Sequence, residues 1–228
     1  MEIRIDSLLE GANRATGAVA IIDVLRAFTT AAVAFANGAT HITMVGSVEE
    51  ALALRDQGVG QLCMGETGGR KPPGFDFGNS PFELSSVDLS GKAIIQRTSA
   101  GTQGIIAASG AAHLFAASLV TASATARALQ ATGVEPATLV AMGNNGTTRT
   151  DEDELCALHL RNLLLGRPGD PHAIQQLILA SEEAERYRDP ARPHLDPRDL
   201  EIALDTDRYD FAIRAAIEDG RPVARRVG

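Results

Sequence analysis

The sequence predicts an α/β fold: a three-layer α/β/α arrangement around a mostly parallel sheet. Two observations predict it. Short unbroken apolar runs, such as Ala18–Ile22, alternate with capped or Ala-rich helical segments, and this order of segments occurs twice. Apolar runs of that length are typical of strands buried on both faces, as parallel strands are. We therefore predict one domain over residues 1–228, with two pseudo-repeated βαβαβ halves at about 18–70 and 91–147.

The first half begins with the strand Ala18–Ile22. A helix follows and ends at Gly38, a typical helix stop. A second helix begins at Ser47, where Ser-Val-Glu-Glu forms a capping box. The predicted elements of this half are the strand 18–22, the helix 29–37, the strand 41–45, the helix from 47 and the strand 61–64.

The second half repeats this order, and some residues repeat with it. Ala93-Ile94-Ile95 parallels Ala20-Ile21-Ile22, and the Gly110 segment parallels the Gly38 segment. Such internal likeness predicts structural pseudo-symmetry. The alternative is that all α/β halves look alike. The predicted elements are the strand 93–96, the helix 102–109, the strand 113–117, the helix 121–132 and the strand 138–142.

The remaining segments connect or follow the two halves. Residues 68–81, rich in Gly and Pro, are predicted to form a crossing loop. The part from about 153 to 228 is predicted to be largely helical, with a basic, frayed tail at 221–228. Its predicted elements are helices at 153–165 and 170–187, an exposed loop at 188–199 with three prolines, and one or two helices or strands at 200–217.

Composition limits the classes of function. The net charge of -8, from 21 Lys+Arg and 29 Asp+Glu, argues against a nucleic-acid or membrane-surface binder. No apolar run approaches the ~20 residues that span a bilayer, and no signal peptide is visible, so we expect a cytoplasmic protein. A disulfide between Cys63 and Cys156 is open in principle, but two buried thiols are favoured. The Ala-rich helices offer flat apolar faces, which suggests a homodimer.

Ligands of open α/β sheets bind beyond the carboxyl ends of strands, and Asp23 stands at such an end. A carboxylate there can bind a divalent cation or act as nucleophile or base. The alternative is a helix N-cap. Arg26 follows closely, and an Asp–Arg pair suits a site that holds both a metal and an anion. Leu25 excludes an Asp-x-Asp phosphoryl-transfer pattern.

The segment Arg97-Thr98-Ser99-Ala100-Gly101-Thr102 joins a strand to a helix and combines a guanidinium with three hydroxyls. Helix N-termini and arginine both favour anions, so we predict anion binding by Arg97, Thr98, Ser99, Gly101 and Thr102. The alternative is simple capping of the helix by Ser99 or Thr102.

Three further segments carry candidate site residues. Glu66 lies in a Gly-rich turn, and the loop after it offers Asp76 as a catalytic carboxylate and Asn79 and Ser80 as substrate contacts, unless Asx turns explain them. The turn with Asn144 and Asn145 belongs at the same strand ends. Glu152 and Asp153 open a helix, where acidic residues also stabilise the macrodipole. The five histidines show no ligand spacing; His41 and His113 are predicted to begin strands.

These segments together resemble the 2-phosphosulfolactate phosphatase family. The likeness spans roughly residues 18–160, and the motifs are in family order. Its most specific strings are Ile22-Asp23-Val24-Leu25-Arg26-Ala27 and Gly74-Phe75-Asp76-Phe77-Gly78-Asn79-Ser80-Pro81. The loop at 97–102 is one common family form, and others have Thr-Thr-Asn-Gly-Thr. No motif matches beyond about residue 165.

The resemblance implies a magnesium-dependent phosphatase that hydrolyses 2-phospho-3-sulfolactate to sulfolactate and phosphate, in a family linked to coenzyme M biosynthesis. It implies Mg²⁺ as cofactor, with Asp23 and Glu66 as leading ligands and Glu152 or Asp153 next. Arg26 and Arg97 would bind the small anionic phosphorylated substrate. A phosphatase for another small phosphorylated hydroxy acid, or a non-catalytic anion-binding module on the same scaffold, is the alternative.

Overall fold

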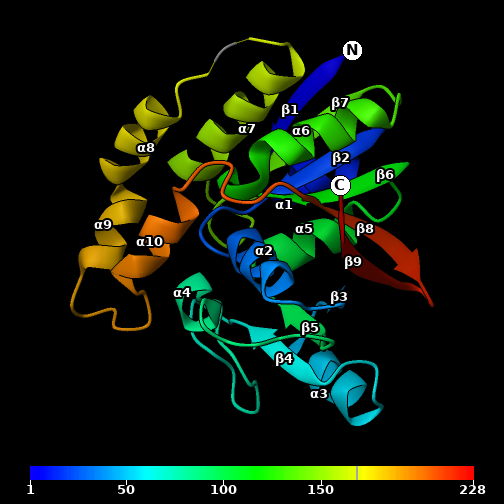
Figure 1. Ribbon diagram of the computed structural model, residues 1–228, viewed down its shortest axis with the longest axis vertical. Helices are drawn as coiled ribbons and strands as arrows, with labels where there is room; N and C mark the ends of the chain where they lie inside the picture. The colour runs from blue at the N-terminus through cyan, green and yellow to red at the C-terminus, as the bar shows by residue number, and fades with distance from the viewer. Residues whose placement is uncertain (168) are drawn as a thin grey trace.

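The computed structural model describes residues 1–167 and 169–228 and shows a nine-stranded sheet with helices on both faces (Figure 1). The predicted α/β class is confirmed. The strands are β1 (Ile3–Ser7), β2 (Ala18–Ile22), β3 (His41–Met44), β4 (Leu62–Gly65), β5 (Ala93–Arg97), β6 (His113–Ala117), β7 (Ala137–Ala141), β8 (Ala212–Glu218) and β9 (Arg221–Val227). The helices are α1 (Leu8–Arg14), α2 (Ala27–Ala36), α3 (Val48–Asp56), α4 (Pro81–Leu84), α5 (Gly101–Ala107), α6 (Ala122–Ala131), α7 (Asp151–Leu164), α8 (Pro171–Leu179), α9 (Glu182–Arg188) and α10 (Pro197–Ala203), with a 3₁₀ turn at Leu119–Thr121.

The sheet consists of two parallel groups joined by an antiparallel hairpin. Its order is β1-β7-β2-β6-β8-β9-β3-β5-β4. The first strand of each predicted half lies between the second and third strands of the other half: β2 between β6 and β7, and β5 between β3 and β4. The two halves are thus interlocked rather than side by side. This order is consistent with the predicted pseudo-repeat.

The turns after β2, β4, β5 and β7 meet at one site, in line with the sequence-based expectation, although an antiparallel hairpin lies between the two parallel groups. Three successive antiparallel pairings separate β6 from β3, so in a flat sheet the groups would point in opposite directions. Neighbouring strands are rotated by about 20–25° relative to each other, and five pairings separate β2 from β5. The strand directions of the two groups are therefore far from fully opposite. The turn after β2 meets the turn after β5: a Cβ added to Gly101 would lie 2.8 Å from Oδ2 of Asp23.

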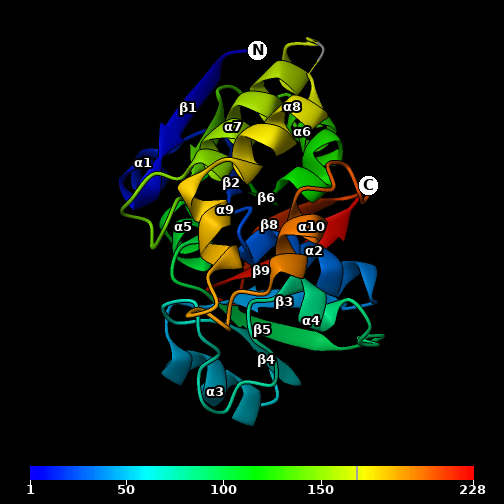
Figure 2. The same cartoon turned by 90° about the vertical axis from the view of Figure 1, so that its left-hand side faces the viewer.

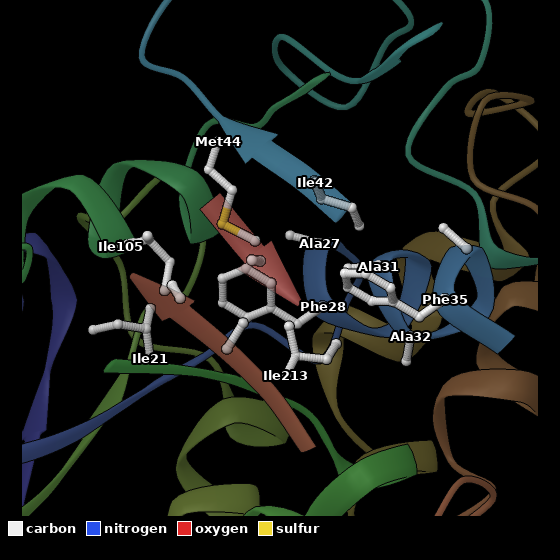
Figure 3. Close-up of a cluster of buried hydrophobic side chains, with 14 of the residues drawn as sticks. Ile21, Ala27, Phe28, Ala31, Ala32, Phe35, Ile42, Met44, Ile105 and Ile213 are labelled. Carbon is white, nitrogen blue, oxygen red and sulfur yellow. The ribbon is translucent and has the colours of Figure 1, made fainter. Parts of the chain in front are cut away.

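Alternate residues of the strands supply cores on opposite faces, which explains the unbroken apolar runs. In β2, Val19 and Ile21 face the core beside α2 and α5, whereas Ala20 and Ile22 face the core beside α6 and α7. Phe28 of α2 is fully buried, and Figure 3 shows it among the side chains of strands and helices from both parallel groups. Truncating it to Ala would cost about 3–5 kcal/mol. This side chain fixes α2, which begins directly after the Asp23 turn.

The predicted cap at Ser47 is confirmed, because its Oγ accepts a hydrogen bond from the Glu50 N–H at 3.0 Å; the Glu50 carboxylate accepts from the Gly46 N–H rather than from Ser47. The predicted helix at 170–187 is two helices, because Ser181 caps a new one by accepting from the Ala184 N–H. Figures 1 and 2 show α8, α9 and α10 stacked along one side of the molecule.

The predicted frayed tail is wrong. Residues 221–227 form β9, which pairs with both β3 and β8, and Val223 and Ala224 are buried. The part after residue 153 is therefore helical only as far as α10. The physical reason is an Asp219-Gly220 turn with positive φ at both residues, which closes a tight β-hairpin. The strand β1 and helix α1 were not predicted.

Several smaller predictions are confirmed. Cys63 and Cys156 are free and buried, and His41 and His113 begin β3 and β6. Within the described residues, no helix is both long enough and apolar enough to cross a bilayer. The Ala-rich helix α2 is buried over Ala27–Phe35, so it offers no free face for the predicted homodimer.

Candidate active site

The candidate site is a cavity of about 140 Å³ where the turns after β2, β4, β5 and β7 meet the C-terminal helices. Four carboxylates and two guanidinium groups line it, so its charged wall is net acidic. Its lining residues are Asp23, Leu25, Arg26, Glu66, Gly68, Gly69, Asn79, Ser99, Ala100, Gly143, Asn144, Asn145, Thr150, Glu152, Glu183, Arg186, Tyr187 and Leu195.

Asp23 lies at the end of β2 and is buried. Its Oδ1 accepts a hydrogen bond from the Ala27 N–H at the start of α2 at 2.9 Å, although the N-cap residue of that helix is Arg26 and not Asp23. Burial raises the pKa of Asp23 to about 6, and the nearby charge of Glu66 adds to the rise. A carboxylate that is desolvated in this way gains stability from a bound cation.

Glu66 is held more firmly than Asp23. One carboxylate oxygen accepts from the Ser99 N–H at 2.5 Å, and the other accepts from the Gly69 N–H at 2.7 Å and from the Ser99 hydroxyl at 3.1 Å. These bonds tie the β4 turn to the β5 turn. Glu66 therefore shapes the cavity wall while keeping its carboxylate there.

Glu152 and Asp153, consecutive residues of α7, have different surroundings. Asp153 accepts from the Val24 N–H at 2.7 Å and from the Gly143 N–H at 2.8 Å, which joins the β2 and β7 turns, and it does not line the cavity. Glu152 lines the cavity, and its buried Oε2 has no hydrogen-bond partner among residues 1–167 and 169–228. Burial raises the pKa of Glu152 to about 8. Of the two, Glu152 is the carboxylate open to a ligand.

The predicted metal ligands do not form a closed cage. Among residues 1–167 and 169–228, no group of three or more His, Cys, Asp or Glu side chains is arranged to hold a metal ion. Mg²⁺ does not require one, because it usually binds one or two carboxylates together with water and substrate phosphate. Asp23 and the unpartnered oxygen of Glu152 fit that description.

Arg26 forms a buried ion pair with Asp199, a residue that the sequence did not indicate. Their closest atoms lie 2.7 Å apart, and the side chains are 4% and 0% exposed. Asp199 also accepts from the Ser80 hydroxyl and the Phe82 N–H. Ser80 therefore fastens its loop to α10 and lies outside the cavity, although it was predicted to contact substrate. Asp199 sets the position of Arg26.

The segment 97–102, which was predicted to bind an anion, uses most of its polar groups in hydrogen bonds within the protein. Arg97 donates to the Glu66 carbonyl at 2.7 Å and to the Thr67 hydroxyl at 2.9 Å, and it does not line the cavity. Thr98 and Thr102 bond each other's N–H and hydroxyl groups. Gly101 lets the turn approach Asp23, and only Ser99 and Ala100 line the cavity.

Asp76 also lies outside the cavity. Its Oδ2 accepts from the Cys63 N–H at 2.8 Å and lies 3.4 Å from Arg55, so it fastens the loop to β4. Asn79, Asn144 and Asn145 line the cavity as predicted. Asn79 is buried, and its Oδ1 has no hydrogen-bond partner within the described part of the chain.

The site residues that the sequence did not indicate come from the C-terminal part. Glu183, Arg186 and Tyr187 of α9 and Leu195 of the following loop line the cavity. Residues 188–199 were predicted to be exposed, yet Leu195 is 7% exposed and Asp199 is fully buried. Spacing alone does not mark Arg186, because Glu185 and Arg188 on the same helix pair at the same interval.

Comparisons with known proteins indicate a family. A family model described as 2-phosphosulpholactate phosphatase matches residues 4–193. A Thermus thermophilus protein described as "Probable 2-phosphosulfolactate phosphatase" is 38% identical over 67% of this chain, and the match covers 64% of that protein. Proteins of the same description from Bacillus subtilis and Thermotoga maritima are 29% and 35% identical; the matches cover 91% and 76% of this chain and 90% and 74% of those proteins.

Proposed function

This chain belongs to the 2-phosphosulfolactate phosphatase family, and we propose that it hydrolyses 2-phospho-3-sulfolactate to 3-sulfolactate and phosphate with Mg²⁺ as cofactor. The observation that carries this proposal is the acidic, desolvated cavity at the end of β2. There, Asp23 and Glu152 have raised pKa values, and one oxygen of Glu152 has no partner in the part of the chain that the structure describes.

The charge of the lining supports a cation. Asp23, Glu66, Glu152 and Glu183 outnumber Arg26 and Arg186, so a phosphate monoester entering alone would meet an excess of negative charge. Asp23 and Glu152 would hold Mg²⁺, which when bound neutralises phosphate oxygens and orients the attacking water. The acidic lining supports the proposal of a cation but does not by itself identify its ligands.

The other residues bind, orient and exclude water. Asn79 carries an unpartnered amide oxygen beside the cavity, a group suited to a substrate hydroxyl or a water. Arg26 supplies positive charge, and its place is fixed by Asp199. Leu25, Tyr187 and Leu195 form an apolar side that limits hydration.

A phosphate-release screen tests the proposal. The purified chain is incubated with 2-phosphosulfolactate, 2-phospholactate and a series of small phosphorylated hydroxy acids, in Mg²⁺ or in excess EDTA. We expect release that requires Mg²⁺ and is fastest with 2-phosphosulfolactate. Release that is fastest with another acid would favour the alternative substrate. No release from any acid would favour the non-catalytic anion-binding module.

The predicted homodimer and cytoplasmic location stay predictions. Size-exclusion chromatography with light scattering would decide the first, because a dimer has twice the 23.9 kDa mass of the chain.

A further inference from the structure

The cavity described above has a neighbour that shares part of its wall. The second cavity measures about 480 Å³ and lies between α9 and the segment after β7. Both are lined by Asn144, Thr150, Glu183 and Arg186. Small-molecule pockets usually measure about 300–1,000 Å³, so the first cavity is below that range and the two together fall within it. A ligand larger than phosphate would therefore extend past Arg186.

Arg186 has hydrogen-bonding capacity that the protein does not use. Its Nη1 bonds both carboxylate oxygens of Glu183, at 2.7 and 2.6 Å. Its Nε is buried and has no partner within residues 1–167 and 169–228. The Nε–Nη2 edge of a guanidinium group matches the spacing of two oxygens on a carboxylate, sulfonate or phosphate. An unpaired buried donor is costly, and an oxyanion would satisfy it.

The same helix offers a second Arg–Glu pair at the same spacing in different surroundings. Arg188 and Glu185 are also three residues apart, with a closest distance of 2.6 Å, as in the Arg186–Glu183 pair. The side chain of Arg188 is 47% exposed and lines neither cavity, whereas that of Arg186 is 31% exposed and lines both. Helix geometry alone thus accounts for the Arg188 pair but not for the unpartnered Nε of Arg186.

We propose that Arg186 determines substrate specificity by binding the oxyanion group attached to C3 of the substrate, whose phosphate is on C2 and whose carboxylate is C1. It would bind this group through its Nε–Nη2 edge, where the two cavities meet. Glu183 holds Nη1 and so orients that edge. This inference rests on the proposed function and adds to it the residue that binds the substituent on C3. In 2-phosphosulfolactate that group is a sulfonate, in 2-phosphomalate a carboxylate, and in 2-phospholactate a hydrogen.

The three compounds allow a direct test. Steady-state kcat/KM is measured with each for the wild type, Arg186→Met, Arg186→Lys and Arg188→Met, with circular dichroism to verify folding. We expect Arg186→Met to lower kcat/KM for 2-phosphosulfolactate by about 10–100-fold and for 2-phospholactate by less than about threefold. Arg186→Lys keeps the charge but not the planar edge, so it should recover part of the loss. Arg188→Met should match the wild type.

The pattern across substrates decides the proposal. A loss with 2-phosphosulfolactate and 2-phosphomalate together supports general oxyanion binding, and a loss with the sulfonate alone supports sulfonate selection. An equal loss with all three compounds, or none, would overturn the proposal.

Failure of the proposed function is distinguishable. If the wild type releases no phosphate from any compound, calorimetric binding of 3-sulfolactate and lactate still tests Arg186. Binding of 3-sulfolactate that weakens at least tenfold in Arg186→Met, with lactate unaffected, would support the remote site. Equal binding of 3-sulfolactate by both proteins would contradict it.

Discussion

The turns after β2 and β5 occupy corresponding places in the strand order, yet they differ in which side chains remain available to a ligand. Each follows a strand that lies between two parallel neighbours, and each leads into a helix. The β2 turn presents Asp23 to the cavity. The β5 turn uses Arg97, Thr98 and Thr102 to bond its own backbone and that of the β4 turn. The end of a strand therefore indicates where a ligand could bind. Which side chains can bind it depends on which of them are not already hydrogen-bonded within the protein.

The largest effect expected from this comparison is on catalysis. Asp23→Asn removes a charge from the cavity and should lower kcat for phosphate release on the order of 10³-fold. Asp76→Asn is the matched control, because Asp76 lies outside the cavity and should change kcat by less than about threefold. Equal losses in the two variants would show that Asp76 acts in the site after all.

The Arg26–Asp199 pair should have the largest effect on stability. Arg26→Met leaves Asp199 buried without its partner, which should lower the free energy of unfolding by about 3–5 kcal/mol. The double variant Arg26→Met/Asp199→Asn removes the buried charge and keeps an oxygen for Ser80 and Phe82, so it should recover part of that loss. Urea denaturation of the three proteins measures it, and a double variant less stable than Arg26→Met would contradict the pairing.

Gly101 tests the contact between the two turns. A Cβ there would lie 2.8 Å from Oδ2 of Asp23 and 2.8 Å from Cβ of Ala27, so Gly101→Ala should displace the carboxylate. A misplacement of about 1 Å costs on the order of 10²-fold in rate. Gly110→Ala is the control, since no atom lies within 4 Å of its added Cβ. An unchanged kcat in Gly101→Ala would contradict this expectation, because it would show that the close contact between the β2 and β5 turns does not position Asp23.

A separate effect is a pH-dependent stability that comes from Glu152. The folded pKa of Glu152 is raised from 4.5 to about 8, so the folded protein binds more protons than the unfolded chain between those values. The metal-free protein should therefore lose stability as pH rises from 4.5 to 8. At pH 8, Glu152→Gln should melt higher than wild type in EDTA, by about 2–4 °C for each kcal/mol. An equal or lower melting temperature would contradict the raised pKa.

The sequence predicted the β2 side of the site well because its signals are local. An apolar strand followed by an aspartate needs no distant partner to be recognised, and Asp23, Arg26, Glu66 and Asn79 do line one cavity. The hydrogen bonds of the loop at 97–102 could not be predicted, because its hydroxyl and guanidinium groups are equally suited to an external anion and to the backbone. Only the three-dimensional structure shows which partner they take.

The C-terminal contribution was missed for a different reason. Glu183 and Arg186 repeat the spacing of Glu185 and Arg188, so no pattern separates the pair in the cavity from the exposed one. Asp199 follows Pro197 at a helix start, where aspartate usually serves the helix itself. The β8–β9 hairpin did carry a local signal. Its Asp-Gly turn is a strong hairpin marker that the basic composition of the tail obscured.

The most direct test of the central claim is calorimetric titration of Mg²⁺ into the wild type, Asp23→Asn, Glu152→Gln and Asp76→Asn at pH 8. The carboxylates that remain open to the cavity should hold the cation. We predict one saturable site in the wild type and in Asp76→Asn, with affinity lowered at least tenfold in Asp23→Asn and Glu152→Gln. Undiminished binding by both Asp23→Asn and Glu152→Gln, or no binding by the wild type even with substrate present, would contradict the account.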